Sequence, residues 1–233
     1  DALRADGLGC YGYPRSTTPF IDSLAEHGIR FEQAISAAPY TYSSTWSLFT
    51  GLFPFQHGSP IVPWRPSPKA PSLPKMLQQA GFVTGFVSQN PWFSDLRVEE
   101  GFDEFLPALE KLYNVPNPQR QPELATREAM KFIGRNREER FFLYVHYMLP
   151  HTPYLPRQDY RYRFSADPFP KAAPDSETLL EMDARRLPAH PEALRQLRAR
   201  YDENLLQVDS EVKRLVEYIR SLDLGENTVV IVA

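Results

Sequence analysis

The chain has 233 residues, of which 42% are hydrophobic and 24% charged, and its formal net charge is -3. This length can bury a substantial core, and the slightly acidic balance lacks the basic footprint of a nucleic-acid-binding protein, so no nucleic-acid partner is expected. The single cysteine, Cys10, excludes a disulfide within the chain. No apolar run reaches the roughly 18 residues that span a bilayer, and no signal peptide or membrane segment is visible.

The first third of the chain predicts one helix, one strand and one long loop. The hydroxyl residues at 16–18 can cap a helix that has Pro19 in its first turn and ends before Gly28. Residues 29–34 can then return as a strand. Residues 53–71 are rich in proline and lack periodicity, which is typical of a long surface loop.

The rest of the chain alternates helical and strand patterns. The expected elements are a helix over 73–80, a strand over 82–88, an irregular stretch over 91–117, a helix over 123–133, a central strand over 141–147, a long helix over 191–222 and a buried strand over 229–233. Residues 157–189 mix proline, charge and aromatic residues without a period. We therefore interpret them as an insertion or lid within a single domain that covers residues 1–233.

This alternation predicts an α/β fold with a mostly parallel central sheet sandwiched by helices. Active groups in such sheets gather at the carboxyl ends of the strands. Asp1, the Thr41 segment, Asn90 and His151 all fall near such ends or in loops that can reach them. Because no strand precedes Asp1 and an apolar run closes the sequence, we expect a fragment that lacks its first strand and its C-terminal part.

Residues 39–51, PYTYSSTWSLFTG, place four Ser or Thr hydroxyls in the five positions from Thr41 to Thr45, just before a short apolar helical run. A helix start carries backbone N–H groups without helical partners and the positive end of the peptide dipole, so it suits a phosphate, a sulfate or an alkoxide. The Thr41 hydroxyl would then supply the attacking oxygen. The alternative is that Ser43, Ser44 and Thr45 are only candidate N-caps, since Ser and Thr are favoured there in any helix.

Four ordered segments resemble the sulfatase family, which is part of the alkaline-phosphatase superfamily. They are DALRADGLGCYGYPR at 1–15, TTPFIDSLA at 17–25, HYMLPHTPYLP at 146–156 and YDENLLQVDSEVKRLVEYI at 201–219. The resemblance covers nearly the whole chain and implies an alkaline-phosphatase-like catalytic domain. It also aligns the Thr41 segment with the loop that carries the family's nucleophile.

The resemblance implies a role for each candidate site residue. Asp1 and Thr41 would bind a divalent cation, with Ca²⁺ expected first and Mn²⁺ or Zn²⁺ as alternatives. Thr41 would attack sulfur or phosphorus and form a covalent ester. His151 would hydrogen-bond the transferred group or protonate the leaving oxygen, and Ser44 and Asn90 would bind the substrate with it.

The sequence departs from the pattern of the best-known arylsulfatases. Their C-x-P-S-R or S-x-P-S-R motif reads TYSST at 41–45 here, and Cys10 lies in a different motif, so no formylglycine is expected. The K-W-H-L-G segment is replaced by SQNPW at 88–92, which removes the expected Lys and His contacts to sulfate. A threonine in the nucleophile position is used by the phosphoglycerol and phosphoethanolamine transferases of the superfamily, which favours phosphoester chemistry.

The resulting hypothesis is a metal-dependent, sulfatase-family enzyme, of the sulfuric ester hydrolase or phosphotransferase type, that acts through a covalent intermediate on Thr41. Its substrate would be a small-molecule, glycan or lipid-linked sulfate or phosphate ester, and family resemblance suggests a periplasmic or extracytoplasmic location. The alternative is a catalytically inactive sulfatase-like binding domain, which the missing Pro, Arg, Lys and His favour. The fragment alone is expected to be inactive.

Several other polar residues are interpreted as structural. Asp6 and Asp209 are expected to make hydrogen bonds that cap or bridge elements near the site. His146 is expected to be a core or supporting histidine, and His57 a loop residue.

Overall fold

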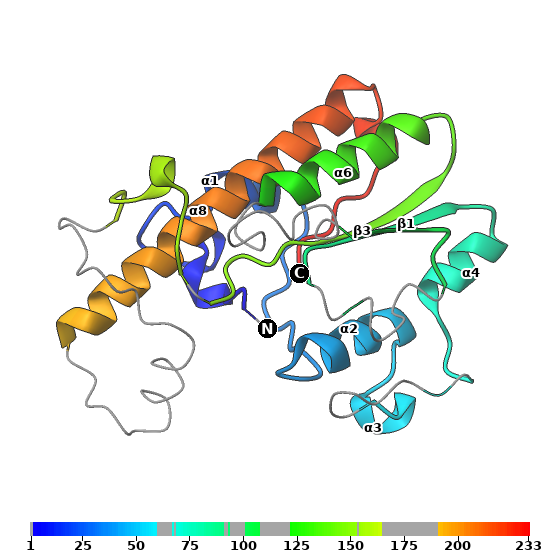
Figure 1. Cartoon of the computed structure of the whole chain (residues 1–233), viewed down its shortest axis with the longest axis horizontal. Helices are drawn as coiled ribbons and strands as arrows, with labels where there is room; N and C mark the ends of the chain where they lie inside the picture. The colour runs from blue at the N-terminus through cyan, green and yellow to red at the C-terminus, as the bar shows by residue number, and fades with distance from the viewer. Residues whose placement is uncertain are drawn as a thin grey trace.

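A computed structural model describes residues 2–59, 67, 69–90, 93, 101–107, 122–152, 154–164 and 191–233. Figure 1 shows their arrangement. The helices are α1 (Pro19–His27), α2 (Thr41–Thr50), α3 (Pro54–His57), α4 (Leu73–Gln79), α6 (Pro122–Arg135) and α8 (Pro191–Ser221), and the strands are β1 (Val83–Ser88), β2 (Glu104–Pro107) and β3 (Phe141–His146). Short 3-10 turns cover Ala5–Gly7, Gly9–Tyr11, Gln158–Tyr160 and Gly225–Asn227.

The three strands form a parallel sheet in the order β2-β1-β3. Ser88 at the end of β1 is in register with Pro107 of β2 and with His146 of β3. All three strands therefore end at the same edge of the sheet. The segments that follow β1 and β3 leave from this edge, which is where parallel sheets collect functional groups.

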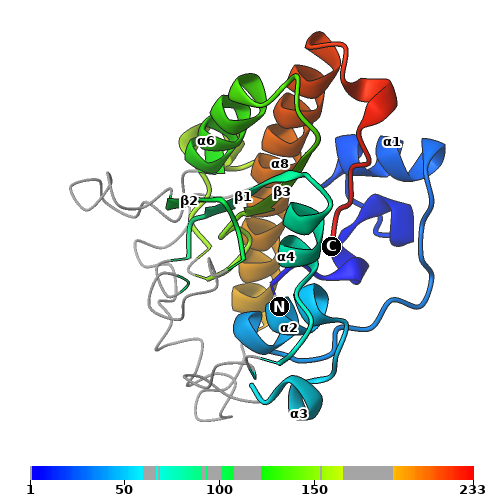
Figure 2. The ribbon, with the colours of Figure 1, turned by 90° about the vertical axis from the view of Figure 1, so that its right-hand side faces the viewer.

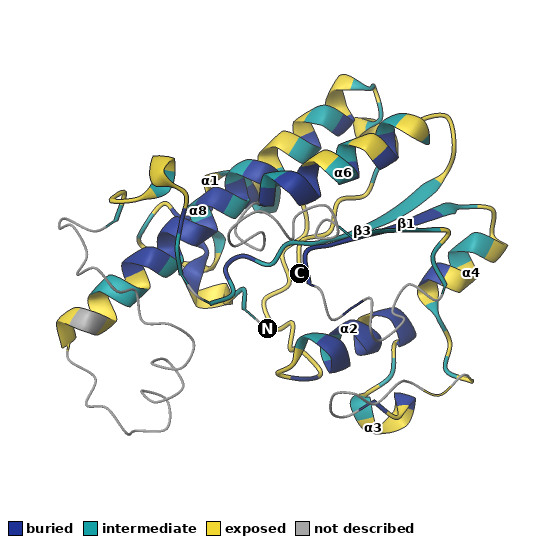
Figure 3. Ribbon diagram, in the orientation of Figure 1, coloured by how far each residue is buried: buried dark blue, intermediate teal, exposed yellow. Residues whose placement is uncertain are grey.

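Helices cover both faces of the sheet, as Figures 1 and 2 show. Phe86 of β1 packs in a cluster with Trp46 and Phe49 of α2, whereas its neighbour Val87 packs with Ala125 and Ala129 of α6 on the opposite face. This alternation follows from the two-residue period of a strand. It makes β1 buried on both sides, which is visible in Figure 3. The expected α/β fold with a helix-covered parallel sheet is confirmed.

The long helix α8 carries buried polar side chains that fix the N-terminal segment. Asp209 of α8 is 3% exposed and accepts hydrogen bonds from the backbone N–H groups of Phe20 at 3.0 Å and Ile21 at 2.8 Å. Asp209 therefore caps α1 from nearly two hundred residues away. The expected structural role of Asp209 is confirmed. The expected Ser or Thr cap is wrong, because Thr18 occupies the N-cap position without a side-chain cap bond.

Two predicted strands are absent from the described part of the chain. Residues 29–34 form turns and irregular backbone, and residues 228–233 belong to no helix or strand. Their apolar side chains lie in solvent, with Ile29 85% and Val229 86% exposed. β-branched composition indicates that a segment fits a half-buried pleated surface, but no described strand offers these two segments a hydrogen-bonding edge.

The sheet itself differs from the expectation in two ways. β2 lies inside residues 91–117, which the sequence indicated to be irregular, because its four residues are too few to show a period. β1, and not residues 141–147, is the middle strand of the described sheet. The proposed lid over 157–189 falls largely outside the described residues, which include only 157–164 of it. Among the described helices, none combines the length and apolarity that membrane crossing needs.

Gly85 lies in the middle of β1, directly beneath α6. A Cβ at this position would lie 2.5 Å from a ring carbon of Phe132, a side chain that is fully buried. Gly85→Ala should therefore destabilise the protein by about 2 kcal/mol through overpacking, as measured by denaturant unfolding. Adding Phe132→Leu should relieve part of the clash. The double variant should therefore lose less unfolding free energy than the sum of the losses in the two single variants. Additive losses would contradict this packing.

Asp209 should also give the protein a pH-dependent stability. Burial raises the pKa of Asp209 from 3.8 to about 6, so the folded state binds the proton more tightly than the unfolded state. The contribution of this group to stability is therefore complete below its unfolded pKa and is lost as pH rises through about 6.

Asp209→Asn cannot titrate, so its unfolding free energy should lack this component. The measurement is the difference between wild-type and variant denaturation curves over that pH interval. The variant should also be less stable by about 1 to 3 kcal/mol, because the amide keeps only one acceptor for two backbone N–H groups. If the unfolding free energies of wild type and variant changed with pH in parallel, Asp209 would not be the source of the pH dependence.

Candidate active site

Helix α2 begins at Thr41. Tyr40 before it is extended and is the N-cap, without a side-chain cap bond. The Ser44 N–H donates to the Tyr40 carbonyl at 3.0 Å, and the Ser44 hydroxyl donates back to the Thr41 carbonyl at 3.0 Å. The interpretation of Ser43, Ser44 and Thr45 as N-caps is therefore wrong, because all three lie inside the helix. Thr41 instead occupies the first helical position, at the positive end of the helix dipole.

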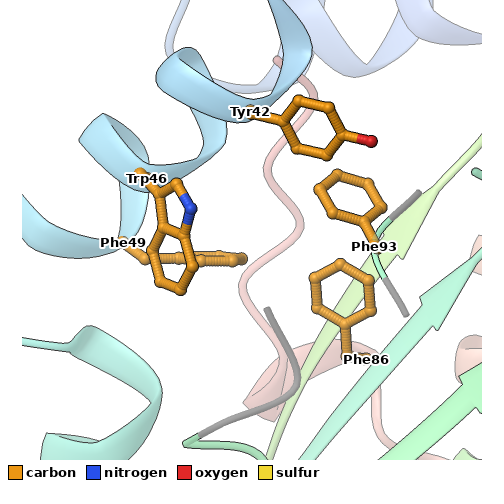
Figure 4. Close-up of a cluster of buried hydrophobic side chains, with 5 residues drawn as sticks. All are labelled: Tyr42, Trp46, Phe49, Phe86 and Phe93. Atoms are coloured by element: carbon orange, nitrogen blue, oxygen red, sulfur yellow. The ribbon is translucent and has the colours of Figure 1, made fainter. Parts of the chain in front are cut away.

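Aromatic packing holds the start of α2 against the end of β3. Tyr42 meets Phe93 edge-on with ring centroids 5.5 Å apart, and Phe93 meets His146 edge-on at 5.1 Å. Figure 4 shows Tyr42 and Phe93 pointing toward each other, beside Phe86 of β1. Deeper in the helix, the ring of Phe49 lies 5.0 Å from that of Tyr144. The first turn of α2 is thereby fixed relative to the carboxyl edge of the sheet.

A hydrogen-bonded loop follows β1 at this edge. The Gln89 N–H donates to the His146 carbonyl at 3.3 Å, and the Gln89 side-chain oxygen accepts from the Met148 N–H at 3.3 Å. The Asn90 N–H donates to the Ser88 hydroxyl at 3.0 Å. The Asn90 residue is 6% exposed. These bonds join the segments that follow β1 and β3, so they place Asn90 beside the exit of β3.

His151 lies in the turn after β3. Its backbone N–H donates to the Met148 carbonyl at 2.9 Å, and its Nδ1 lies 2.9 Å from the Thr152 carbonyl. Because a carbonyl only accepts, Nδ1 must carry a proton, and the Nε2 of a neutral ring is left with its lone pair. Burial lowers the pKa of His146 to about 4. His146 is thus held neutral beside the candidate site.

The structure groups the sequence-predicted residues in two sets. Thr41 and Ser44 share the first turn of α2, while Asn90 and His151 follow the ends of adjacent strands. The Tyr42–Phe93–His146 contacts connect the two sets. Asp1 lies outside the described residues, so its expected place in the site stays a prediction. Within the described residues, His, Cys, Asp and Glu form no group of three that could hold a metal ion.

The sequence interpretation missed one buried residue next to the site. His57 was expected to be a loop residue, but it is fully buried at the end of α3 and its Nε2 lies 3.1 Å from the Ser47 hydroxyl. A signal was present in the sequence. Ser43 and Ser47 are four residues apart and share one face of α2, so a buried polar face that needs a partner could have been expected.

Comparison with known proteins supports the family assignment. The Sulfatase family model matches residues 1–233. The chain is 23% identical to an arylsulfatase of Hemicentrotus pulcherrimus, over 99% of this chain and 44% of the relative. It is 24% identical to N-acetylgalactosamine-6-sulfatase of Homo sapiens, over 96% of this chain and 46% of the relative. The chain therefore spans less than half the length of these two relatives.

Solved structures share the fold. The phosphonate monoester hydrolase of Agrobacterium radiobacter superposes with a TM-score of 0.72 at 19% identity, over 98% of this chain and 59% of its own. The periplasmic domain of EptC from Escherichia coli, solved in complex with Zn, gives 0.66 at 19% identity, over 95% of this chain and 57% of its own. With a family match over its whole length and this shared fold, the chain belongs to the sulfatase family.

Proposed function

We propose that the full-length protein is a metal-dependent hydrolase or transferase of sulfate or phosphate esters, with Thr41 as nucleophile. The observation that carries the proposal is the position of Thr41, which is the first residue of α2 and is held by Tyr42 and Phe93 against the carboxyl edge of the sheet. A helix N-terminus there favours negative charge, both on an attacking oxygen and on a bound sulfuryl or phosphoryl group.

The reaction requires three contributions from this chain. The Thr41 hydroxyl loses its proton to solvent, and its oxygen forms a bond to sulfur or phosphorus as the bond to the ester oxygen breaks, which leaves a covalent ester on Thr41. The backbone N–H groups of the first helical turn stabilise the charge on the non-bridging oxygens. His151, in its protonated form, donates the Nε2 proton to the leaving oxygen, since its Nδ1 is already engaged with the Thr152 carbonyl. Water, or a second alcohol in a transferase, then releases the group.

A divalent cation would be held by the Asp1 carboxylate and the Thr41 hydroxyl. Both donors are hard oxygens, which suits Ca²⁺, with Mn²⁺ and Zn²⁺ as alternatives. When bound, the cation would supply positive charge that lowers the pKa of the nucleophile and neutralises the transferred group. The EptC structure with Zn gives a precedent for a divalent ion in this fold. Further ligands are required beyond these two.

The substrate we propose is a small-molecule, glycan or lipid-linked ester bound by Ser44, Asn90 and His151. One similar structure was solved with D-glucosamine-2-N,6-O-disulfate as its substrate, and EptC is a periplasmic domain, which supports an extracytoplasmic location. Formylglycine chemistry is not part of the proposal, because the candidate nucleophile is a threonine. The one cysteine, Cys10, lies in the Gly9–Tyr11 turn, where its N–H donates to Asp22.

Thr41→Ala should abolish turnover of a sulfate or phosphate monoester by the full-length protein, with kcat reduced by about 10³-fold or more. Thr41→Ser keeps a hydroxyl and should retain part of the activity. Thr228→Ala is a matched control, because its hydroxyl bonds a backbone carbonyl near the C-terminal end of the chain, and it should behave as wild type. Steady-state kinetics with nitrophenyl sulfate and nitrophenyl phosphate give the comparison. Undiminished turnover by the alanine variant rules out Thr41 as nucleophile.

Cation removal should abolish the same activity. Dialysis against EDTA should remove turnover, and addition of Ca²⁺, Mn²⁺ or Zn²⁺ should restore it, with the most effective ion identifying the metal. Asp1→Asn should weaken ion binding in calorimetry, since it removes the proposed carboxylate ligand. A protein that binds none of these ions and hydrolyses neither ester would instead be the inactive binding domain.

A further inference from the structure

The face of helix α2 that carries Ser43 and Ser47 makes polar contacts with α3 and the residues after it. The reaction described above does not use these contacts. In Figure 1, α2 lies between the sheet and α3. His57 ends α3 and is 0% exposed. Its Nε2 lies 3.1 Å from the hydroxyl of Ser47, and its Nδ1 lies 3.2 Å from the backbone N of Ser59. Both ring nitrogens of a buried titratable side chain are therefore engaged.

The partners of His57 define its tautomer. The Ser59 backbone N–H only donates, so Nδ1 must accept and carries no proton. The neutral ring then has its proton on Nε2, which donates to the Ser47 hydroxyl. Burial lowers the pKa of His57, with the Ser43 backbone acting more weakly in the opposite direction, so the shift agrees with the neutral ring that the geometry assigns. Protonation of Nδ1 would place two donors against each other and break the contact with Ser59.

The same segment has a second bond to α2. The Ser43 hydroxyl donates to the Ser59 carbonyl at 2.9 Å, and Ser43 is 0% exposed. Ser43 and Ser47 lie one turn apart on the same helix face. The two bonds are therefore spaced so that they set both the rotation of α2 about its axis and its position along that axis. Thr41 precedes Ser43 by two residues, within the same first turn.

From these contacts we propose that His57 is a positioning residue, which acts through Ser47 and Ser59 to hold the first turn of α2 in the orientation that aims the Thr41 hydroxyl at the substrate. The inference rests on the proposed function of Thr41. It assigns to His57 no contact with the substrate. A small rotation of a helix displaces a nucleophile enough to lower the rate, because catalysis depends on near-attack geometry.

The test compares variants of the full-length protein that remove one bond at a time. Ser47→Ala and His57→Asn both remove the bond between α3 and Ser47, since an asparagine amide reaches the position of Nδ1 but not that of Nε2. Each should lower kcat about tenfold, which corresponds to about 1.4 kcal/mol, with KM changed less than about twofold. The double variant should be no slower than either single variant, because both remove the same bond. His57→Gln, whose amide reaches the position of Nε2, should restore much of the rate.

Ser210→Ala is the matched control. Ser210 lies on α8, and its hydroxyl is hydrogen-bonded to Tyr160 of the Gln158–Tyr160 turn, outside the α2–α3 contact. This control variant should lower the melting temperature by an amount similar to Ser47→Ala and leave kcat unchanged. If Ser47→Ala and His57→Asn lower kcat no more than Ser210→Ala, the positioning role is overturned. That result is distinct from failure of the proposed function, which would appear as full activity in Thr41→Ala.

A spectroscopic measurement tests the contact without turnover. Nitrogen NMR of histidine-labelled protein should show one buried ring that is protonated at Nε2 and unprotonated at Nδ1, and this signal should disappear in His57→Gln. A His57 ring protonated at Nδ1 would overturn the inference, because it could not accept the Ser59 N–H.

Discussion

The packing of α2 against the aromatic half of the sheet is the constraint on which the candidate site depends. Tyr42, Trp46 and Phe49 extend from one side of the helix and meet Phe86 and Phe93 in a single buried cluster (Figure 4). Rings of this size bury large apolar areas, and edge-to-face pairs add a geometric preference to the burial. The cluster is asymmetric. Its Tyr42 end lies against Phe93 and His146, so the first turn of α2 sits where β3 ends.

The same helix buries both aromatic rings and hydroxyl groups, and it places them on two different faces. One face supplies aromatic contacts to the sheet. The other supplies Ser43, whose hydroxyl donates to the Ser59 carbonyl just beyond α3, and Ser47, whose hydroxyl is hydrogen-bonded to His57 at the end of α3. A buried hydroxyl without a partner costs free energy, so the polar face both requires and fixes the neighbouring helix. Thr41 is left partly exposed at the helix start, where a reactant can reach it.

The sequence predicts features that depend on neighbouring residues better than features that depend on residues far apart in the chain. Periodicity and start or stop residues identified α1, α4, α6 and α8 and the strands β1 and β3 to within a few residues. They failed for β2, which is short, and for residues 29–34, whose composition suits a strand but which have no described partner. The cap of α1 could not be predicted locally, because its acceptor is Asp209 on a distant helix.

The candidate site shows the same limit. Family motifs located Thr41, Asn90 and His151, and strand order alone then placed the last two at one sheet edge. The burial of His57 needed the contact between α3 and α2, which the sequence indicates only through the spacing of two serines. The hydroxyls after Thr41 were ambiguous in the sequence, since a capping serine and a serine inside a helix look alike until the helix start is known.

The claim at the centre of this account is that Thr41 carries the transferred group. The most direct measurement is mass spectrometry of peptides from the full-length protein, quenched with acid during turnover of a sulfate or phosphate ester. The account predicts that the peptide containing Thr41 gains the mass of one sulfuryl or phosphoryl group, with fragmentation placing it on that residue. A peptide that stays unmodified while product accumulates, or a label on another residue, would contradict it.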